Sequence, residues 1–368
     1  MTGGLRDERR ARPGKEIPPA LPGVDSVAVS TRIRLARNFK DYPFPNRLTD
    51  PALAQEIVHL VSEELRDVES FRLYRMSNVG EETAQFLRER NLISQDLLKN
   101  RAISAVLVLE DESVSVMINE EDHIREQYFM KGFDLETAYE RLSGIDDLIA
   151  SAIPFAYDRQ LGYLTACPTN LGTGLRASVM LFLPAAARAG LMRGIAEELS
   201  RDGLTVRGAY GEGSGAEGAL YQISNERTLG PSEGEILGAV ESAVCRLIRT
   251  EREERARLLR EDRAGIADVV LRSLGILTNC VRLTMREFMR YMANVKLGVA
   301  LGLLSGSLEE LDGLIMNVRP ANIDQLNGGP PEEGGYDIFR AAYVGDVLRR
   351  MELITEEGRA RLLDPPQG

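Results

Sequence analysis

The sequence contains a short acidic run, Asn119-Glu120-Glu121-Asp122-His123, directly after an apolar, strand-like segment from Val114 to Ile118. The end of a strand is a place where side chains can be directed into a shared site. Three adjacent carboxylates repel one another, and a nearby cation would offset that repulsion. The run is therefore a candidate site for a cationic group, and a solvated surface turn is the alternative interpretation.

Arginine is concentrated in a second segment, Ser30 to Arg37 (STRIRLAR). Successive side chains of an extended chain alternate between two faces, so Arg32 and Arg34 would lie on the same face. Two guanidinium groups on one face can hold phosphate oxygens through paired hydrogen bonds. The alternative is a basic edge strand that faces solvent.

A third segment, Cys167 to Ser178 (CPTNLGTGLRAS), combines glycine with arginine. Gly172 and Gly174 would permit close approach of the backbone to a ligand, and Arg176 follows them. The sequence has no GxxxxGK[ST] motif, so this is not a Walker A loop. An ordinary tight turn is the alternative.

A fourth segment, Arg207 to Gly218 (RGAYGEGSGAEG), satisfies the GxGxxG pattern. A dinucleotide fingerprint must open a helix, whereas Ala219 to Ser224 has the composition of a strand, so we reject that reading. The glycines instead predict a loop that could close over a substrate, or a flexible hairpin tip. Taken together, acids at one strand end and arginines on separate segments predict a triphosphate facing a cationic acceptor.

The composition limits the class of protein. The chain has 368 residues, of which 43% are hydrophobic, enough for a large domain and a smaller one. A net charge of −11 argues against nucleic-acid binding, which usually needs a basic face. No apolar run reaches the roughly 18 residues that would span a membrane. Met1 to Gly23 lacks the apolar centre of a secretory signal and is expected to be a mobile tail.

The cysteines and histidines predict no metal site. Cys167, Cys245 and Cys280 are far apart, and His59 and His123 add no ligand spacing. Three unpaired cysteines fit a reducing cytoplasm.

Periodicity predicts the elements that must position these residues. Pro51 begins a helical pattern after Asp50, and residues 103–109 and 113–118 form a hairpin pattern. We also expect helices over 135–153 and 184–200, and strands over 162–165, 177–183, 204–206 and 219–224.

From Pro231 onward the pattern is almost entirely helical, with a long charged helix over 232–263 and further helices around 266–275, 284–304, 307–317 and 336–354. The expected fold is α+β: an antiparallel sheet flanked by helices, followed by a C-terminal helical bundle. We place a tail at 1–23, a catalytic domain at 24–258 and a helical domain at 259–368, and expect the bundle to form a homodimer.

Five motifs occur in a recognisable order: Ser30–Asn38 (STRIRLARN), Asn119–Arg125 (NEEDHIR), Cys167–Met180 (CPTNLGTGLRASVM), Arg207–Glu212 (RGAYGE) and Tyr221–Asn225 (YQISN). The sequence resembles the ATP:guanidino phosphotransferases, the superfamily of creatine and arginine kinases, over about residues 24–352. The finer resemblance is to the bacterial McsB-type protein arginine kinases.

The resemblance implies a protein arginine kinase that uses ATP and Mg²⁺, the metal being held mainly by phosphates and water. It implies catalytic roles for Glu121, Glu212 and Cys167. The residues it assigns to ATP are Ser30, Thr31, Arg32, Ile33, Arg34, Asn91, Arg125, Arg176, Ala177, Ser178, Val179, Met180, Arg207, Gly208, Ala209, Tyr210, Gly211 and Glu212.

The sequence departs from the family pattern at two positions. Asn91 stands where the family usually has a nucleotide-contacting histidine. The family's RDxxRA motif, which recognises phosphoarginine, is kept here at Asp337, Arg340 and Ala341, while Tyr336 replaces the leading arginine.

The chemistry gives each acid a role. A guanidinium has a pKa far above 7 and stays protonated, so Glu121 would take the proton only as the P–N bond forms. Glu212 and a thiolate of Cys167 would grip the rest of the planar group. His123 is expected to be a hydrogen-bonded strand-end histidine, and Asp122 to orient Arg125.

Two other functions remain open from the sequence. One is a small-molecule guanidino (phosphagen) kinase, although those enzymes carry an N-terminal helical domain and lack this helical tail. The other is a phosphoarginine-binding adaptor with little catalysis. The resemblance implies protein substrates with exposed arginine and a Clp-type ATPase or protease as partner.

Overall fold

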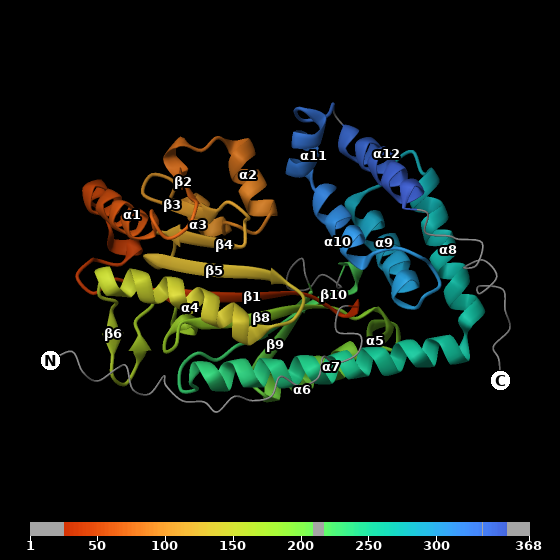
Figure 1. Ribbon diagram of the computed structural model, residues 1–368, viewed down its shortest axis with the longest axis horizontal. Coiled ribbons are helices and arrows are strands. Elements are labelled where there is room, and N and C mark those ends of the chain that lie inside the picture. Colours follow the sequence, from red (N-terminus) through yellow and green to blue (C-terminus); the bar gives the residue numbers. More distant parts are fainter. Residues whose placement is uncertain (1–25, 209–216, 333, 352–368) are drawn as a thin grey trace.

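The computed structural model describes residues 26–208, 217–332 and 334–351. The residues described form an eight-stranded sheet in the order β2-β3-β4-β5-β1-β8-β10-β9, in which every neighbouring pair is antiparallel (Figure 1). In chain order the strands are β1 (Ala28–Arg37), β2 (Phe71–Arg75), β3 (Ala105–Leu109), β4 (Val114–Ile118), β5 (Ile124–Lys131), β8 (Leu175–Phe182), β9 (Leu204–Gly208) and β10 (Leu220–Asn225).

The strand that carries the first arginine pair is central. β1 pairs with β5 on one side and β8 on the other, so the alternative of a solvent-facing edge strand is wrong. The expected hairpin is confirmed as β3 and β4. Residues 162–163 form β7 (Gly162–Tyr163), which pairs with β6 (Tyr157–Asp158) in a separate two-stranded sheet and bridges to Gly172.

Helices lie between the strands in sequence and follow the last of them. They are α1 (Pro51–Leu65), α2 (Glu81–Glu89), α3 (Gln95–Lys99), α4 (Leu135–Ala152), α5 (Pro184–Arg188), α6 (Met192–Arg201), α7 (Glu233–Glu261), α8 (Arg263–Asn279), α9 (Met285–Ala300), α10 (Leu308–Asn317), α11 (Pro320–Asn327) and α12 (Gly335–Arg350). The single helix expected over 184–200 is wrong: Gly190, with a φ of +75°, separates α5 from α6.

Capping explains where the main helices begin. The Asp50 side chain accepts a hydrogen bond from the Ala52 amide at the start of α1, with Pro51 in the first turn. Ser232 and Glu235 form a reciprocal capping box at the start of α7. These local signals are why the sequence pattern located both helices correctly.

One face of the sheet is a continuous apolar surface. Ile33 and Leu35 of β1, with Ala177 and Val179 of β8, are fully or almost fully buried in one cluster with residues of α4 and α7. Figure 1 shows α4 and α7 running along this side of the sheet. Alternation along each strand therefore directs the intervening residues, Arg32, Arg34, Arg176 and Ser178, to the opposite face.

The described residues cover the opposite face only at its two ends. At the β3–β4 end, Val106 and Met117 pack against α2 and α3. At the other end, Met180, Phe182 and Leu220 pack against the C-terminal helices. The fold class is confirmed: an antiparallel sheet flanked by helices, followed by a helical region.

The helical region has its own core and is joined to the sheet by a long helix. Phe288, Met292 and Val295 of α9 are fully buried in a cluster with residues of α8, α10 and α12. Because α7 runs unbroken through residue 258, the division at 258/259 remains a prediction.

Within the described ranges, no helix combines the length and apolarity that crossing a membrane requires.

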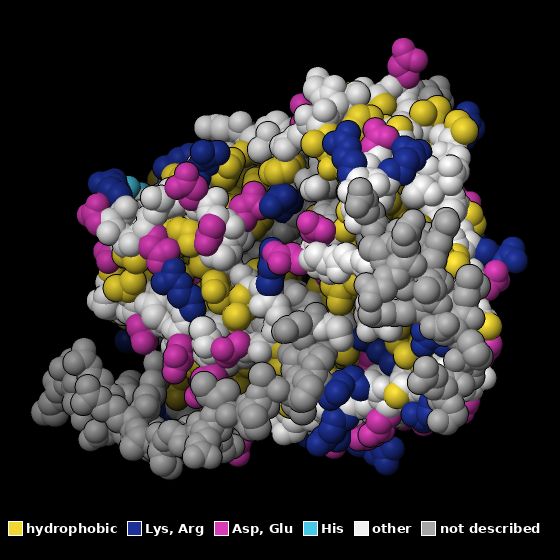
Figure 2. Space-filling model, turned by 45° about the vertical axis from the view of Figure 1, so that its right-hand side comes forward, with side chains coloured by type: hydrophobic (Ala, Val, Ile, Leu, Met, Phe, Trp, Pro, Cys, Tyr) yellow, Lys and Arg dark blue, Asp and Glu magenta, His cyan; other side chains and the backbone are white. Residues whose placement is uncertain are grey.

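On the side of the molecule drawn in Figure 2, basic and acidic side chains are interspersed outside the grey atoms.

Candidate active site

Five arginines project from one face of the sheet, which we call the arginine face. Arg34 of β1 lies opposite Arg176 of β8, and Arg125 of β5 lies opposite Ala36, two residues along β1 from Arg34. Arg207 of β9 lies opposite Gln222, which in turn lies opposite Met180 of β8. Paired residues of antiparallel strands share a face, so Arg32, Arg34, Arg125, Arg176 and Arg207 all do.

Three of these arginines, Arg32, Arg34 and Arg176, are desolvated and lie close to other arginines. Burial, followed by the charges of Arg125 and Arg176, lowers the pKa of Arg32 to about 10. Burial and the same neighbours, with Arg32, hold the pKa of Arg34 well below its usual value. The buried Nε atoms of Arg34 and Arg176 have no hydrogen-bond partner among the described residues. Such a cluster is complementary to a polyanion such as a triphosphate.

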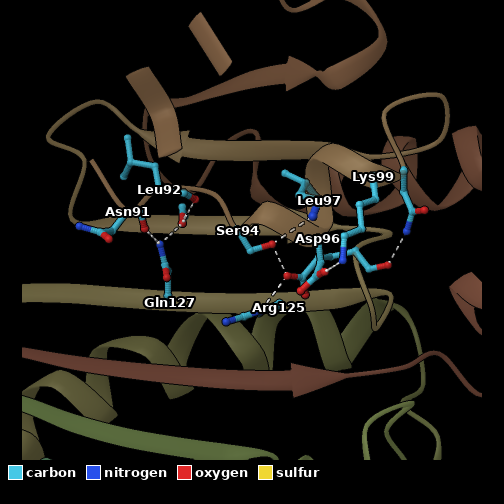
Figure 3. A network of polar contacts seen from close by, with 11 residues as sticks. Asn91, Leu92, Ser94, Asp96, Leu97, Lys99, Arg125 and Gln127 are labelled. Atoms are coloured by element: carbon cyan, nitrogen blue, oxygen red, sulfur yellow. Dashed lines mark hydrogen bonds and ion pairs between the residues drawn. The ribbon is translucent and has the colours of Figure 1, made fainter. Parts of the chain in front are cut away.

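The acidic turn between β4 and β5 divides its three carboxylates. Glu120 is 1% exposed, and its Oε1 accepts hydrogen bonds from Ser94 and from Arg125, the latter at 2.7 Å. Figure 3 shows Ser94 and Arg125 converging on this carboxylate from α3 and β5. The expectation that Asp122 orients Arg125 is therefore wrong, because Glu120 pairs with it.

Glu121 is the acid of this turn that faces solvent. Partial desolvation, followed by the charges of Asp122, Glu120 and Asp96, raises the pKa of Glu121 above that of an ordinary glutamate. Asn119, at the start of the turn, adopts a left-handed φ of +56°, which Asn tolerates better than most residues. The turn thus presents one carboxylate and buries the two beside it.

Cys167 lies close to this turn and to the arginine face. Asp122 Oδ1 accepts hydrogen bonds of 2.6 Å from the Ala166 amide, which directly precedes Cys167, and 2.6 Å from Asn38 Nδ2. The Cys167 thiol is half-buried and lies 3.0 Å from Thr169 Oγ1. The charge of Cys167 has a small raising effect on the pKa of Arg176. The two groups are therefore near each other.

The two glycines of the cysteine segment approach the chain's own backbone. A Cβ on Gly172 would lie 2.3 Å from the Thr228 carbonyl oxygen, and one on Gly174 would lie 2.6 Å from the Ala36 carbonyl oxygen. Both glycines have positive φ, of +107° and +63°. The expectation that they allow approach of a ligand is therefore corrected: they let the segment pack against its neighbours.

Arg37 fixes the end of the same segment from the apolar side of the sheet. Its guanidinium donates to Asp146 through Nε at 3.0 Å and Nη2 at 2.9 Å, and to the Thr173 carbonyl through Nη1 at 2.9 Å. It also stacks 3.7 Å from the Tyr163 ring centroid. These contacts lie on the apolar face of the sheet, opposite the arginine face. Arg37 therefore has a structural role and holds the segment that leads to the site.

We expect Arg37→Met to destabilise the protein by about 3–5 kcal/mol, because it would leave the Asp146 carboxylate buried without its cation. Urea unfolding measures the change. The double variant Arg37→Met/Asp146→Leu removes both charges and should recover part of the loss. Equal stability of the single and double variants would contradict this account.

His123 has a structural role, as the sequence predicted. Its Nδ1 accepts from the Phe39 amide at 3.1 Å, its Nε2 lies 2.9 Å from the Pro43 carbonyl, and its ring stacks on Phe39. Burial lowers the pKa of His123 to about 4, so the ring is neutral near pH 7 and Nε2 carries the proton.

The structure does not bring every sequence-assigned residue to the arginine face. Thr31, Ile33, Ala177 and Val179 are buried on the opposite face. Ser30, Ser178 and Met180 share the arginine face, and Ser178 Oγ donates to the Arg32 carbonyl. Gly208 ends β9, while Ala209, Tyr210, Gly211 and Glu212 lie outside the described residues.

Asn91 lies at the β5 side of the arginine face. It is exposed, has a φ of +60°, and its carbonyl accepts from Gln127 Nε2 at 2.5 Å (Figure 3). Gln127 is the cross-strand partner of Arg34. The backbone of Asn91 is therefore tied to the strand beside the arginines.

The residues assigned to phosphoarginine are bonded within the helical domain. Arg340 is 3% exposed, and its Nη1 donates to Asp337 at 2.7 Å and to the Leu283 carbonyl at 2.8 Å. Ala341 is buried in the helical core. Tyr336 donates from its hydroxyl to Asp324 Oδ1 at 2.8 Å.

A bridge that no sequence pattern indicated joins α2 and α11. Glu89, the last residue of α2, accepts a 2.9 Å hydrogen bond from the Ala321 amide through Oε2 and a bond from Arg319 through its carbonyl. Figure 1 shows the two helices facing each other. More than 200 residues separate the partners, so no local pattern could have indicated it.

The described ranges contain no cluster of three or more His, Cys, Asp or Glu side chains that could hold a metal ion.

Comparison with known proteins identifies the family. Residues 52–254 match the model of the ATP:guanido phosphotransferase C-terminal catalytic domain, and residues 263–359 match that of the protein-arginine kinase McsB C-terminal domain. A protein-arginine kinase of Caldanaerobacter subterraneus is 40% identical over 331 residues, which are 89% of this chain and 98% of the relative. The chain belongs to the protein-arginine kinase family.

Other relatives and solved structures agree with this assignment. Protein-arginine kinases of Clostridium acetobutylicum and Halalkalibacterium halodurans are 40% and 41% identical, covering 88% and 89% of this chain and 97% and 93% of their own. Among solved structures, lombricine kinase matches with a TM-score of 0.56 and 26% identity over 63% of this kinase and 68% of that chain. The sequence-based recognition of the family is confirmed.

Proposed function

We propose that the arginine face and the Glu121 turn form the catalytic centre of this kinase. As an ATP-dependent phosphotransferase of the family, it transfers the γ-phosphoryl group of ATP to arginine side chains of proteins. The observation that supports this site is the cluster of desolvated arginines with unpartnered Nε atoms beside one exposed carboxylate. Arg32, Arg34, Arg125, Arg176 and Arg207 would hold the triphosphate.

In this proposal Glu121 acts on the acceptor. Removing a proton from the acceptor guanidinium before the transfer step would cost roughly 7–9 kcal/mol near pH 7, so this does not occur. Glu121 instead holds the planar group in line with the γ-phosphorus and takes the proton as the P–N bond forms and the bond to the leaving ADP oxygen breaks. Glu212 and the Cys167 thiolate would grip other edges of the acceptor.

The proposed cofactor is Mg²⁺. The described residues supply no cage of carboxylates, which fits a cation held mainly by phosphate oxygens and water. When bound, it would neutralise charge on the transferred group.

We expect the protein to label casein with phosphate on arginine when it is given ATP and Mg²⁺. Mass spectrometry under conditions that preserve the acid-labile P–N bond would locate the label. Heat-treated protein is the negative control. A label that appears on free arginine but not on protein arginine would instead support a small-molecule guanidino kinase.

Three further proposals concern the context of the reaction. The helical domain would bind phosphoarginine near Asp337, Arg340 and Ala341. It would also form a homodimer, and light scattering of the full chain tests the dimer. The labelled proteins would be delivered to a Clp-type protease in the cytoplasm, and co-purification of labelled casein with such a protease tests that step. The phosphoarginine and Clp proposals rest on the family resemblance. The homodimer rests on the helical bundle, and the cytoplasm on the three unpaired cysteines.

A further inference from the structure

Asp122 joins two segments that are far apart in sequence. Its Oδ1 accepts two hydrogen bonds of 2.6 Å, one from the Ala166 amide and one from Asn38 Nδ2. Asn38 continues the network, because its Oδ1 accepts from the His123 amide at 2.9 Å and its Nδ2 also donates to the Leu164 carbonyl at 3.1 Å. The β4–β5 turn and the cysteine segment are thereby fixed to the end of β1.

The position of Asp122 in the chain makes this contact significant. Glu121 immediately precedes Asp122, and Cys167 immediately follows Ala166. Glu121 and Cys167, two of the three groups proposed to hold the acceptor, are thus each one residue from a bonded atom. A short chain of covalent and hydrogen bonds links the carboxylate to the thiol and does not pass through the arginine face.

The Asp122 carboxyl group is buried and accepts several hydrogen bonds. It is 2% exposed, and burial raises its pKa, while hydrogen bonds from Ala166, Asn38 and Asn170 oppose that rise. Removing the carboxylate would leave several donors without their acceptor, which costs more than an ordinary surface contact. Asp122 is therefore a strong tie between the two segments.

The other end of the cysteine segment is anchored separately. Thr228 Oγ1 lies within hydrogen-bond distance of the Thr169 and Leu171 carbonyls, at 2.9 and 2.7 Å, and Arg37 holds the Thr173 carbonyl. Loss of Asp122 would consequently free the part of the segment that carries Cys167 while leaving its remainder in place.

We propose that Asp122 is a positioning residue that sets the place of Cys167 relative to Glu121, and so aligns the acceptor guanidinium. The proposal deepens the catalytic assignment above and rests on it. Asp122 does not itself touch the reacting atoms. Its effect should appear in kcat and in acceptor binding. The KM for ATP should stay near its wild-type value, because Arg32, Arg34, Arg176 and Arg207 stand on β1, β8 and β9, and Arg125 is held by Glu120.

The test compares Asp122→Ala with Asp122→Asn in the full-length protein. Asn keeps an oxygen that can accept from both Ala166 and Asn38, so Asp122→Asn should retain most activity. Asp122→Ala should lower kcat by about tenfold to a hundredfold, the usual effect of losing a hydrogen bond to a charged group. Equal kcat of Asp122→Ala and wild type would overturn the proposal.

A double-variant cycle shows whether Asp122 acts through Cys167. The losses in kcat of Asp122→Ala and Cys167→Ser should be strongly non-additive, since the second change has little left to disturb. A general structural defect would instead give additive losses, and that result would contradict the proposal.

Thiol alkylation gives a readout independent of activity. Iodoacetamide should modify Cys167 faster in Asp122→Ala than in wild type or Asp122→Asn, while Cys245 and Cys280 react at unchanged rates, as followed by peptide mass spectrometry. Unchanged alkylation of Cys167 would overturn the positioning role. If Cys167→Ser alone retained full kcat, the proposed role of the thiol would fail, and alkylation would still decide the role of Asp122.

Discussion

Glu121→Gln should lower kcat by at least about a hundredfold, the low end of what a general base contributes. Glutamine has the size of glutamate and can still accept a hydrogen bond from a guanidinium, but it cannot take its proton. ATP affinity should be unchanged, because the five arginines stand on other strand positions. Single-turnover transfer to casein measures the first quantity, and nucleotide titration calorimetry measures the second.

The pH dependence provides a second test of Glu121. Its raised pKa means that activity should fall as the pH drops through a value above the usual range of glutamate. Asp96→Asn is the matched control: it removes a neighbouring negative charge that contributes to the rise, so the acid limb should move to lower pH. If the acid limb of the pH profile lay at the same pH in wild type and in Asp96→Asn, a group other than Glu121 would control it.

Arg34→Met should weaken ATP binding by about tenfold to a hundredfold and yet stabilise the unliganded protein. The first effect follows from the loss of a charge-assisted contact with phosphate. The second follows because the Arg34 guanidinium is desolvated beside three other arginines, and replacing such a group with an apolar one can stabilise a fold by about 1–4 kcal/mol. Calorimetric titration and thermal unfolding without nucleotide measure the two effects.

Arg201→Met, at an exposed position on α6, is the control for the second prediction. It makes the same substitution at an arginine outside the arginine face. Both the ATP affinity and the unfolding temperature should therefore remain near their wild-type values. If Arg34→Met kept its ATP affinity and lowered the unfolding temperature, Arg34 would be a structural residue, and the phosphate assignment would be wrong.

The sequence located the elements of this site because their signals are local. Two-residue alternation put Arg32 and Arg34 on one face of a strand, and β1 shows that arrangement. The apolar run and the acids after it located β4 and the turn that ends it. Motif order identified the family without any knowledge of contacts, since the motifs are contiguous in the chain.

Contacts between distant segments were the part that the sequence left undecided or predicted wrongly. Asp122 and Glu120 are chemically similar and close in the chain. Only the course of β1 and of the 164–167 segment determines that Glu120 pairs with Arg125 and that Asp122 accepts a hydrogen bond from the Ala166 amide. Gly172 and Gly174 have the composition of a ligand loop, but the packing partners that require them, Thr228 and Ala36, are distant in sequence.

The sequence by itself determined the family, the α+β fold class and the identities of the acids and arginines, because composition, periodicity and contiguous motifs are local properties. The tertiary structure alone decided which carboxylate is exposed, which arginine Nε atoms have no hydrogen-bond partner among the described residues, and how the cysteine segment is tied to the acidic turn. Those outcomes depend on strand register and burial, which arise only when segments separated by many residues pack together.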